Sequence, residues 1–283
     1  MSRNFFGSAA STLSTTIRER IASRLEPQRF AIPVYRGTGR QETLVGSGIL
    51  LAIAGVKFFC TAAHVFDALA RTPLVLHGEG PAHLVKTQAH VTQLPATGRG
   101  ADKYDLLIDR FESDRARWFS SHRFITVDQI DQNEIPDYRT LLYTFAGYPA
   151  SANRRQGEPK LATYTDGPLE FEKYESYGFV PNLHLITGFN KKRMIDAAGK
   201  IVTPCDPHGI SGGPVWRLSY PSAGERTKFR PKLVGIGLEY RPDALIALRL
   251  SLVLETIRSL YPDVSVGIPR SQWIGVNATT ATQ

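Results

Sequence analysis

The segment 209–214, of sequence Gly-Ile-Ser-Gly-Gly-Pro, constrains the fold of this 283-residue chain more than any other feature. Glycines around Ser211 predict a sharp loop that exposes the serine hydroxyl. The backbone N–H groups beside it are then free to point at a negative charge developing on a substrate oxygen, as covalent acyl transfer requires. The pattern Gly-x-Ser-x-Gly also describes the nucleophile elbow of another fold. The segment alone therefore leaves more than one architecture open.

The order of the candidate residues along the chain separates these architectures. A nucleophilic serine needs a histidine to take its proton and an acid to orient that histidine. The α/β-hydrolase order requires a histidine after Ser211. All seven histidines precede Ser211: His64, His77, His83, His90, His122, His184 and His208. The subtilisin order requires an aspartate before the histidine, but none precedes Asp67, which excludes the best candidate, His64. The order histidine, aspartate, serine remains, which is that of the chymotrypsin-like double barrel.

His64 follows a predicted buried strand. The segment 56–65 is apolar and rich in aromatic and β-branched residues, and its Thr-Ala-Ala lets the chain turn tightly before the histidine. A second apolar strand at 45–51 precedes it, joined by a short turn around Gly55. A lone histidine at a strand end would most simply cap the strand by hydrogen bonding. The presence of Ser211 in the same chain favours a catalytic role instead.

Gly-Ser-Gly at 46–48 followed by Thr-Ala-Ala-His at 61–64 resembles the trypsin-like serine peptidase family, most closely its bacterial, disulfide-poor branch. The resemblance implies an all-β fold of two six-stranded antiparallel β-barrels, and an N-terminal helix and a C-terminal helix are predicted in addition to the barrels. It implies a serine endopeptidase that works through an acyl-enzyme, with His64 as general base and then acid and Ser211 as nucleophile. No cofactor and no metal are expected.

The acid of the trio is expected to be Asp105. It directly precedes the apolar run Leu-Leu-Ile at 106–108, and the resemblance to the family's Asp-Leu-Ala-Val pattern implies a buried carboxylate that orients the histidine. Two rivals lie nearby. Asp102 is interpreted as a solvated loop charge, and Asp109 lies at the far end of the strand.

The backbone N–H groups of Gly209 and Ser211 are expected to form the oxyanion hole. Gly209 permits backbone angles that turn its N–H inward, which a side chain would resist. For substrate binding, the resemblance places the floor of the primary pocket at Cys205. It places the pocket wall at three consecutive residues: Leu238, Glu239 and Tyr240. Cys205 carries no charge that would attract a basic side chain. Tyr240 stands where family members often have a small residue that keeps the entrance of the primary pocket open. A small or uncharged substrate side chain is therefore predicted.

Two departures from secreted family members concern activation and redox state. Ile210 stands where those enzymes carry the aspartate that pairs with a new amino terminus, and no Ile-Val-Gly-Gly sequence precedes the first strand. Cleavage-dependent activation is therefore not expected, and the site is either preformed or ordered by a regulatory partner or another segment. The only cysteines are Cys60 and Cys205, and so few indicate a reducing compartment and free, buried thiols.

Composition limits the partners. The net charge is +8, but the basic residues are scattered, with small clusters only at 154–155 and 191–193, and no nucleic-acid motif accompanies them. No apolar stretch approaches the roughly 20 residues of a membrane span, and the amino terminus lacks the apolar core of a secretory signal. A cytoplasmic, bacterial protein is predicted, with a protein or peptide substrate, no specific nucleic acid and no membrane.

Three regions are predicted along the chain. Residues 1–30 form an N-terminal helical extension, in which apolar residues every four positions predict an amphipathic helix over 13–25. Residues 31–265 form the peptidase domain, with the boundary between barrels near 120–140. Residues 266–283 form a loosely ordered tail.

Within the domain, turn-bounded apolar runs predict strands at 141–148, 232–240 and 244–250. The first resembles a Gly-aromatic-Pro element of the family's second barrel, and the second resembles the strand that pairs with a bound peptide. The polar stretch 150–176 is interpreted as a surface loop, and a closing helix is predicted over 251–260. The alternative to a peptidase is a binding module of the same fold that is catalytically silent or gated by a partner.

Overall fold

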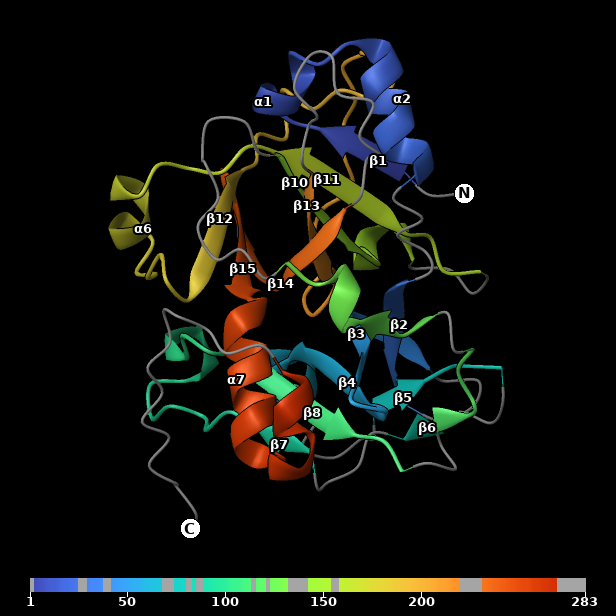
Figure 1. Cartoon of the computed structure of the whole chain (residues 1–283). Helices are drawn as coiled ribbons and strands as arrows, with labels where there is room; N and C mark the ends of the chain where they lie inside the picture. The colour runs from blue at the N-terminus through green and yellow to red at the C-terminus, as the bar shows by residue number, and fades with distance from the viewer. Residues whose placement is uncertain are drawn as a thin grey trace.

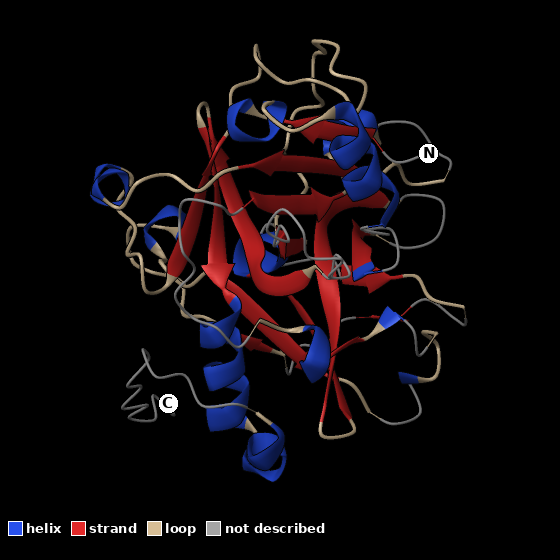
Figure 2. Cartoon of the chain, turned by 45° about the horizontal axis from the view of Figure 1, so that its top comes forward, coloured by secondary structure: helices blue, strands red, loops and turns tan. Residues whose placement is uncertain are grey.

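A computed structural model of the chain describes residues 3–24, 30–37, 42–67, 74–79, 83–84, 89–112, 116–120, 123–131, 142–153, 158–218 and 231–268. These residues form a mostly β structure of two curled sheets, each a half-barrel, with a few short helices (Figures 1 and 2). The predicted all-β class is therefore confirmed. The basic pair at 154–155 and the tail from residue 269 onward lie outside the described residues.

The first sheet has eight strands, and seven of them follow the order β6-β5-β2-β3-β4-β8-β7 while β9 pairs with β3. Their bounds are β2 Ala31–Arg36, β3 Thr43–Ile53, β4 Val56–Ala62, β5 Leu74–Leu76, β6 His83–Leu84, β7 His90–Val91, β8 Leu106–Arg110 and β9 Ile125–Thr126. The predicted hairpin of β3 and β4 is confirmed, since Ile53 and Val56 end an antiparallel pair. Ala54 and Gly55 between them both have positive φ, 49° and 82°, as a tight turn matched to the twist of two strands requires.

The second sheet has seven strands in the order β1-β11-β10-β13-β14-β15-β12. Their bounds are β1 Arg3–Phe6, β10 Leu142–Gly147, β11 Ala162–Asp166, β12 His184–Gly188, β13 Pro214–Leu218, β14 Lys232–Arg241 and β15 Ala244–Arg249. The strands predicted at 141–148, 232–240 and 244–250 are thus confirmed as β10, β14 and β15. An isolated bridge between Pro168 and Thr187 brings the chain after β11 beside β12, so the sheet curls back toward its own edge.

The structure differs from two expectations about strands. The barrels were predicted with six strands each, whereas the residues that the structure describes form sheets of seven and eight strands, so the predicted number is not confirmed. The additional strand of the second sheet is β1, which joins its edge parallel to β11. The stretch 150–176 is not only a surface loop, because β11 within it is buried along its whole length. Its polar residues pair inside the sheet, where the hydroxyls of Thr165 and Thr144 lie 2.8 Å apart.

Five short α-helices flank the sheets in the part of the chain that the structure describes. They are α1 Ser8–Ser11, α2 Thr15–Arg24, α4 Ala63–Asp67, α6 Glu172–Ser176 and α7 Leu250–Leu260. The predicted amphipathic helix near residues 13–25 is present as α2, and its Ile21 is buried in the main core while Leu13 and Ile17 pack against that core. No helix in the described part of the chain has the length and apolar character that crossing a membrane requires.

The predicted closing helix is present as α7, and it joins the two halves. It follows β15 of the second sheet and extends into the half of the molecule that holds the first sheet (Figure 1). Tyr261, directly after α7, packs against Phe58 of β4, with ring centroids 5.2 Å apart. Val253 and Ile257 of α7 share one buried cluster with Phe58 of the first sheet and Trp216 of the second. A single core therefore spans both sheets, and segments that meet between the sheets are held in fixed positions.

Candidate active site

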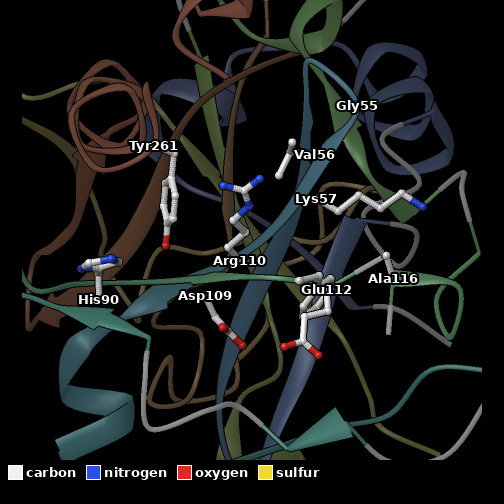
Figure 3. A pocket seen from close by; sticks show the side chains of 10 residues that line it. Gly55, Val56, Lys57, His90, Asp109, Arg110, Glu112, Ala116 and Tyr261 are labelled. Atoms are coloured by element: carbon white, nitrogen blue, oxygen red, sulfur yellow. The ribbon is translucent and has the colours of Figure 1, made fainter. Parts of the chain in front are cut away.

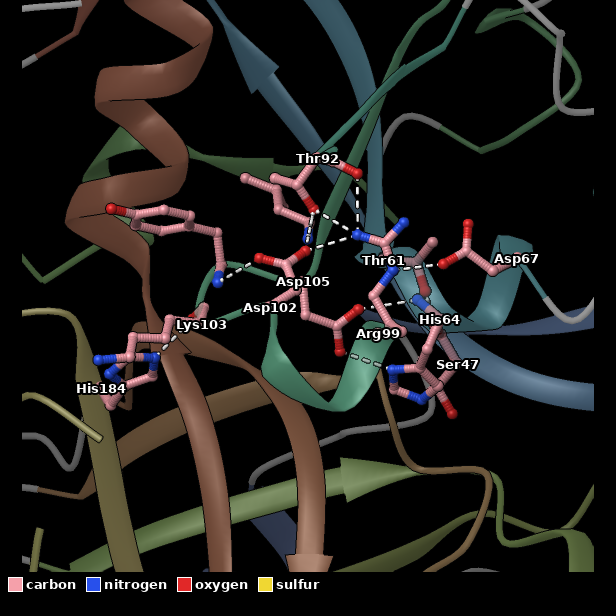
Figure 4. A network of polar contacts seen from close by, with 12 residues as sticks. Ser47, Thr61, His64, Asp67, Thr92, Arg99, Asp102, Lys103, Asp105 and His184 are labelled. Carbon is pink, nitrogen blue, oxygen red and sulfur yellow. Dashed lines mark hydrogen bonds and ion pairs between the residues drawn. The ribbon is translucent and has the colours of Figure 1, made fainter. Parts of the chain in front are cut away.

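His64 and Asp105 are brought together by the pairing of β4 with β8. These strands are antiparallel with Ala62 opposite Leu106, so the residues just beyond them are neighbours. Asp105 Oδ1 accepts a hydrogen bond from the backbone N–H of His64 (2.8 Å), and Asp105 Oδ2 lies 2.6 Å from His64 Nδ1 (Figure 4). An ionised carboxylate only accepts, so Nδ1 carries the proton and Nε2 is left as a proton acceptor.

The side chains of Asp105 and His64 are buried to different extents, which suits an acid that orients a histidine and a histidine that accepts a proton. The Asp105 side chain is 10% exposed, whereas that of His64 is 38% exposed. The carboxylate is therefore enclosed while the imidazole has access to solvent. The backbone of Asp105 has φ of +39°, a left-handed conformation that costs a non-glycine residue on the order of 1–3 kcal/mol and persists only when the surroundings hold it.

A buried ionic network around Asp102 keeps the Asp105 backbone in this conformation. Asp102 accepts hydrogen bonds from the Thr92 hydroxyl (2.6 Å) and the Tyr104 N–H (2.9 Å) and pairs with Arg99 at 2.5 Å. Burial alone would raise the pKa of Asp102, but these hydrogen bonds, with one from the Asp105 N–H, outweigh it and lower the pKa. The interpretation of Asp102 as a solvated charge was wrong, since its side chain is only 5% exposed.

Arg99 connects this network to the histidine. Its Nε also pairs with Asp67, the last residue of the α4 helix that carries His64 (Figure 4). One guanidinium therefore ties the His64 helix to the loop that presents Asp105. The sequence did not reveal Arg99, because its partner Asp67 lies 32 positions away.

The second sheet also contacts the Asp105 loop. His184 of β12 is fully buried, and its Nε2 lies 2.6 Å from the carbonyl oxygen of Lys103. Burial is the main cause that lowers the pKa of His184, so the ring is neutral. A neutral ring donates from Nε2 to Lys103 and accepts at Nδ1 from the Val180 N–H (3.1 Å). The loop that carries Asp105 is thus held in place by contacts from both halves of the molecule.

The rival Asp109 lies elsewhere. It is opposite Phe59 within the β4–β8 pair and is 3% exposed. With His90, Arg110 and Tyr261 it lines a pocket of about 710 Å³ (Figure 3). None of the predicted site residues lines this pocket.

The Ser211 loop lies against the strand that leads to His64. The backbone N–H of Ser47 in β3 donates to the Ser211 carbonyl (2.9 Å). Gly212, with φ of +84°, is packed so closely that a Cβ there would be 2.1 Å from both the Ser47 carbonyl oxygen and Thr61 Oγ1. Thr61 precedes His64 by three residues, so the loop and the histidine belong to one region. Ser211 is partly exposed. Both Ser211 and His64 are among the described residues, and no hydrogen bond joins their side chains.

Some backbone N–H groups in this loop form hydrogen bonds and others do not. Those of Ile210, Gly212 and Gly213 donate to carbonyls at 3.0, 2.6 and 2.9 Å. The N–H groups of Gly209 and Ser211 have no hydrogen-bond partner among the described residues. Gly209 has φ of +97°, the conformation for which a glycine was expected. The two predicted oxyanion donors are therefore the two that remain available.

The carbonyl groups beside these donors are held away by other segments. The His208 carbonyl accepts from the Ala150 N–H (2.7 Å), and the Gly209 carbonyl accepts from the Ser47 hydroxyl (2.8 Å). Neither oxygen can then approach the Ser211 N–H and occupy it. Sequence reasoning used the Gly-Ser-Gly motif only as a resemblance and missed this role of Ser47, since Gly209 is 162 positions away.

The predicted pocket residues lie around an aromatic cluster. Cys205 is partly exposed, and its carbonyl accepts from the Tyr164 hydroxyl (3.0 Å). Tyr240 packs edge-on against His208 and Phe189, with ring centroids 5.1 and 5.8 Å apart. Of the other two predicted wall residues, Leu238 is buried in the main core and Glu239 pairs with Arg241.

Both cysteines are free. Cys60 is buried, as expected, whereas Cys205 is not fully so. Within the described ranges, no cluster of three or more histidine, cysteine, aspartate or glutamate residues is placed to hold a metal ion. No protein-family model and no curated protein matches the sequence.

Proposed function

We propose that this chain is a serine endopeptidase and that its two half-barrels form a chymotrypsin-like double barrel. The observation that carries the proposal is the contact of the buried Asp105 carboxylate with Nδ1 of a half-exposed His64. A histidine that only capped a strand would not need a buried acid to fix its tautomer. The two open N–H groups beside Ser211 add support, because they are the donors that acyl transfer requires.

In the proposed mechanism, Ser211 Oγ attacks the carbonyl carbon of the substrate peptide while His64 Nε2 takes the hydroxyl proton. Asp105 stabilises the resulting imidazolium, and the N–H groups of Gly209 and Ser211 bind the oxyanion. His64 then protonates the leaving amine, and the acyl-enzyme remains. Water attacks the ester with His64 again as base, which releases the acid product and restores the serine.

No hydrogen bond joins the Ser211 and His64 side chains in this structure, which does not contradict the mechanism. Catalytic hydrogen bonds are often long in unliganded enzymes and tighten when substrate binds.

Strand β14 offers a place for an extended substrate. Its pairing with β13 ends at Ile236 opposite Pro214, whereas β14 continues to Arg241. Residues 238–241 therefore extend past the start of β13, beside the Ser211 loop. An extended peptide can add to such an edge through main-chain hydrogen bonds. We therefore propose a protein or peptide substrate, and the free cysteines fit a cytoplasmic, reducing environment.

The direct test is labelling with a fluorophosphonate probe, which reacts covalently with an activated serine. We expect the wild-type protein to be labelled and Ser211→Ala to lose all labelling while it keeps its thermal stability. Ser176→Ala, at an exposed serine of α6, is the matched control and should label normally. Equal labelling of Ser211→Ala and wild type would refute the assignment.

One observation favours the alternative of a silent or partner-gated binding module. Tyr240 and His208 pack together beside the nucleophile loop, which narrows the region where a substrate side chain would enter. A silent module would bind extended peptides but would not react with the probe. A gated enzyme would react only after its partner is added.

A further inference from the structure

Ser47 is a fully buried residue of β3 that makes four hydrogen bonds around the candidate site. Its N–H donates to the Ser211 carbonyl (2.9 Å), and its hydroxyl donates to the Gly209 carbonyl (2.8 Å). The hydroxyl also accepts from the Tyr148 N–H (2.9 Å), and its own carbonyl accepts from Thr61 Oγ1 (2.6 Å). One residue thus joins the nucleophile loop, the end of β10 and the strand that leads to His64.

The hydroxyl of Ser47 controls the orientation of two peptide groups. It holds the Gly209 carbonyl directly. It also holds Tyr148, and two residues later the Ala150 N–H binds the His208 carbonyl at 2.7 Å. If the His208–Gly209 peptide turned over, the His208 oxygen would enter the cleft and the Gly209 N–H would leave it. If the Gly209–Ile210 peptide turned over, the Gly209 oxygen would be free to approach the Ser211 N–H, and the bond from the Ile210 N–H to the Pro207 carbonyl would be lost. The open state of the Gly209 and Ser211 donors therefore depends on this hydroxyl.

The packing leaves no room for a substitute. A Cβ added at Gly147 would lie 2.7 Å from Ser47 Oγ and 2.8 Å from Ile210 Cα, so the hydroxyl fills the space between β10 and the loop. Removing one oxygen atom leaves less space than a water molecule needs, so water cannot restore both hydrogen bonds. Ile210 is itself buried in the core of the second sheet and carries no charge that could fix the loop in another way.

We propose that Ser47 is a positioning residue that keeps the nucleophile loop permanently in its open form, so that the protein needs no cleavage step to form its oxyanion hole. This inference rests on the proposed peptidase function. It explains how the site can be preformed although Ile210 cannot make an ion pair with a new amino terminus.

The test compares Ser47→Ala with Thr144→Val. Thr144 is an equally buried hydroxyl on β10, paired with Thr165 at 2.8 Å and not with the loop. We expect Ser47→Ala to lower kcat and the rate of fluorophosphonate labelling by about 10- to 100-fold, with KM changed less than about threefold, because the oxyanion donors act in the transition state. Thr144→Val should lose similar thermal stability but keep its kcat.

An unchanged kcat in folded Ser47→Ala, or an equal loss in Thr144→Val, would overturn the proposal. If Ser47→Ala does not fold, Ser47→Cys fills the same space with a thiol that is only a weak hydrogen-bond donor, and the same expectation applies. A crystal structure of the variant separates this proposal from the peptidase assignment. Should the wild type fail to label, the peptidase assignment fails. The Ser47 proposal then stands only if the Gly209–Ile210 peptide is turned or disordered in the variant, and an unchanged loop refutes it.

Discussion

Asp105 combines three tasks in one side chain and its backbone. Its carboxylate accepts from the His64 N–H and faces Nδ1, and its carbonyl accepts from the Ala63 N–H at 3.0 Å. The backbone of Asp105 has a left-handed φ of +39°, and both groups contact the same segment, residues 63 and 64. An aspartate tolerates this conformation better than most residues. The identity of the residue and the shape of its backbone are therefore both part of the site.

Replacement of Asp105 by asparagine tests this arrangement. The amide N–H₂ would donate to Nδ1 and move the ring proton to Nε2, so His64 could no longer accept a proton from Ser211. We expect the second-order rate of fluorophosphonate labelling to fall on the order of 10⁴-fold near neutral pH.

The control is Asp109→Asn, in the β8 strand that follows Asp105 and away from His64. It should label at close to the wild-type rate while the variant is folded. A fall of less than about tenfold in Asp105→Asn would contradict the orienting role.

The loop from Arg99 to Asp105 is a structural element without a long regular segment, and its shape comes from charge. Asp102 and Arg99 are 5% and 11% exposed, and their pair links the loop to Thr92 and to the end of α4. Such a buried pair gives precise geometry but makes the loop depend on the charge of Asp102. The pKa of Asp102 is lowered in the folded protein, so the native state favours the ionised form.

The direction of the pH dependence follows from that shift. The stabilisation by ionised Asp102 is fully present above its usual pKa of 3.8 and is lost as the pH falls through the lower pKa of the folded state. We expect Asp102→Asn to reduce the free energy of unfolding by about 2 kcal/mol at pH 7. The difference from wild type should shrink below pH 3.8. Urea unfolding of both proteins at pH 7 and under acid conditions measures this, and an equal difference at both would contradict it.

The amino-terminal segment belongs to the architecture of the whole molecule. Strand β1 extends the second sheet, Phe5 and Phe6 are buried, and Asp166 of β11 accepts from the Ser8 and Ala9 N–H groups at 3.2 and 2.8 Å. Residues 1–30 were expected as a helical extension, and their helix α2 also packs on the main core. Such a segment supports the second sheet and is poorly suited to act as a removable inhibitor.

Deletion of residues 1–11 distinguishes support from inhibition. Loss of two buried phenylalanines, each worth about 1.5–3 kcal/mol, should lower the melting temperature clearly without increasing fluorophosphonate labelling. Asp166→Ala should produce the same direction of change with a smaller loss, because the strand pairing remains. Faster labelling after the deletion, with an unchanged melting temperature, would instead support gating by this segment.

The amino-acid sequence by itself predicted the class of fold, His64 and Ser211 of the proposed site, and Asp105 ahead of two rival aspartates. Short apolar runs, turn glycines and the order of His64, Asp105 and Ser211 are local or ordinal properties, which the chain carries before it folds. Only the tertiary structure decided the rest. It showed β1 as a sheet strand, Asp102 as a buried ion, and Ser47 and Arg99 as the links between distant segments. These roles arise from contacts between residues far apart in the chain, and hydrophobic periodicity and local motifs carry no information about which buried polar groups will meet.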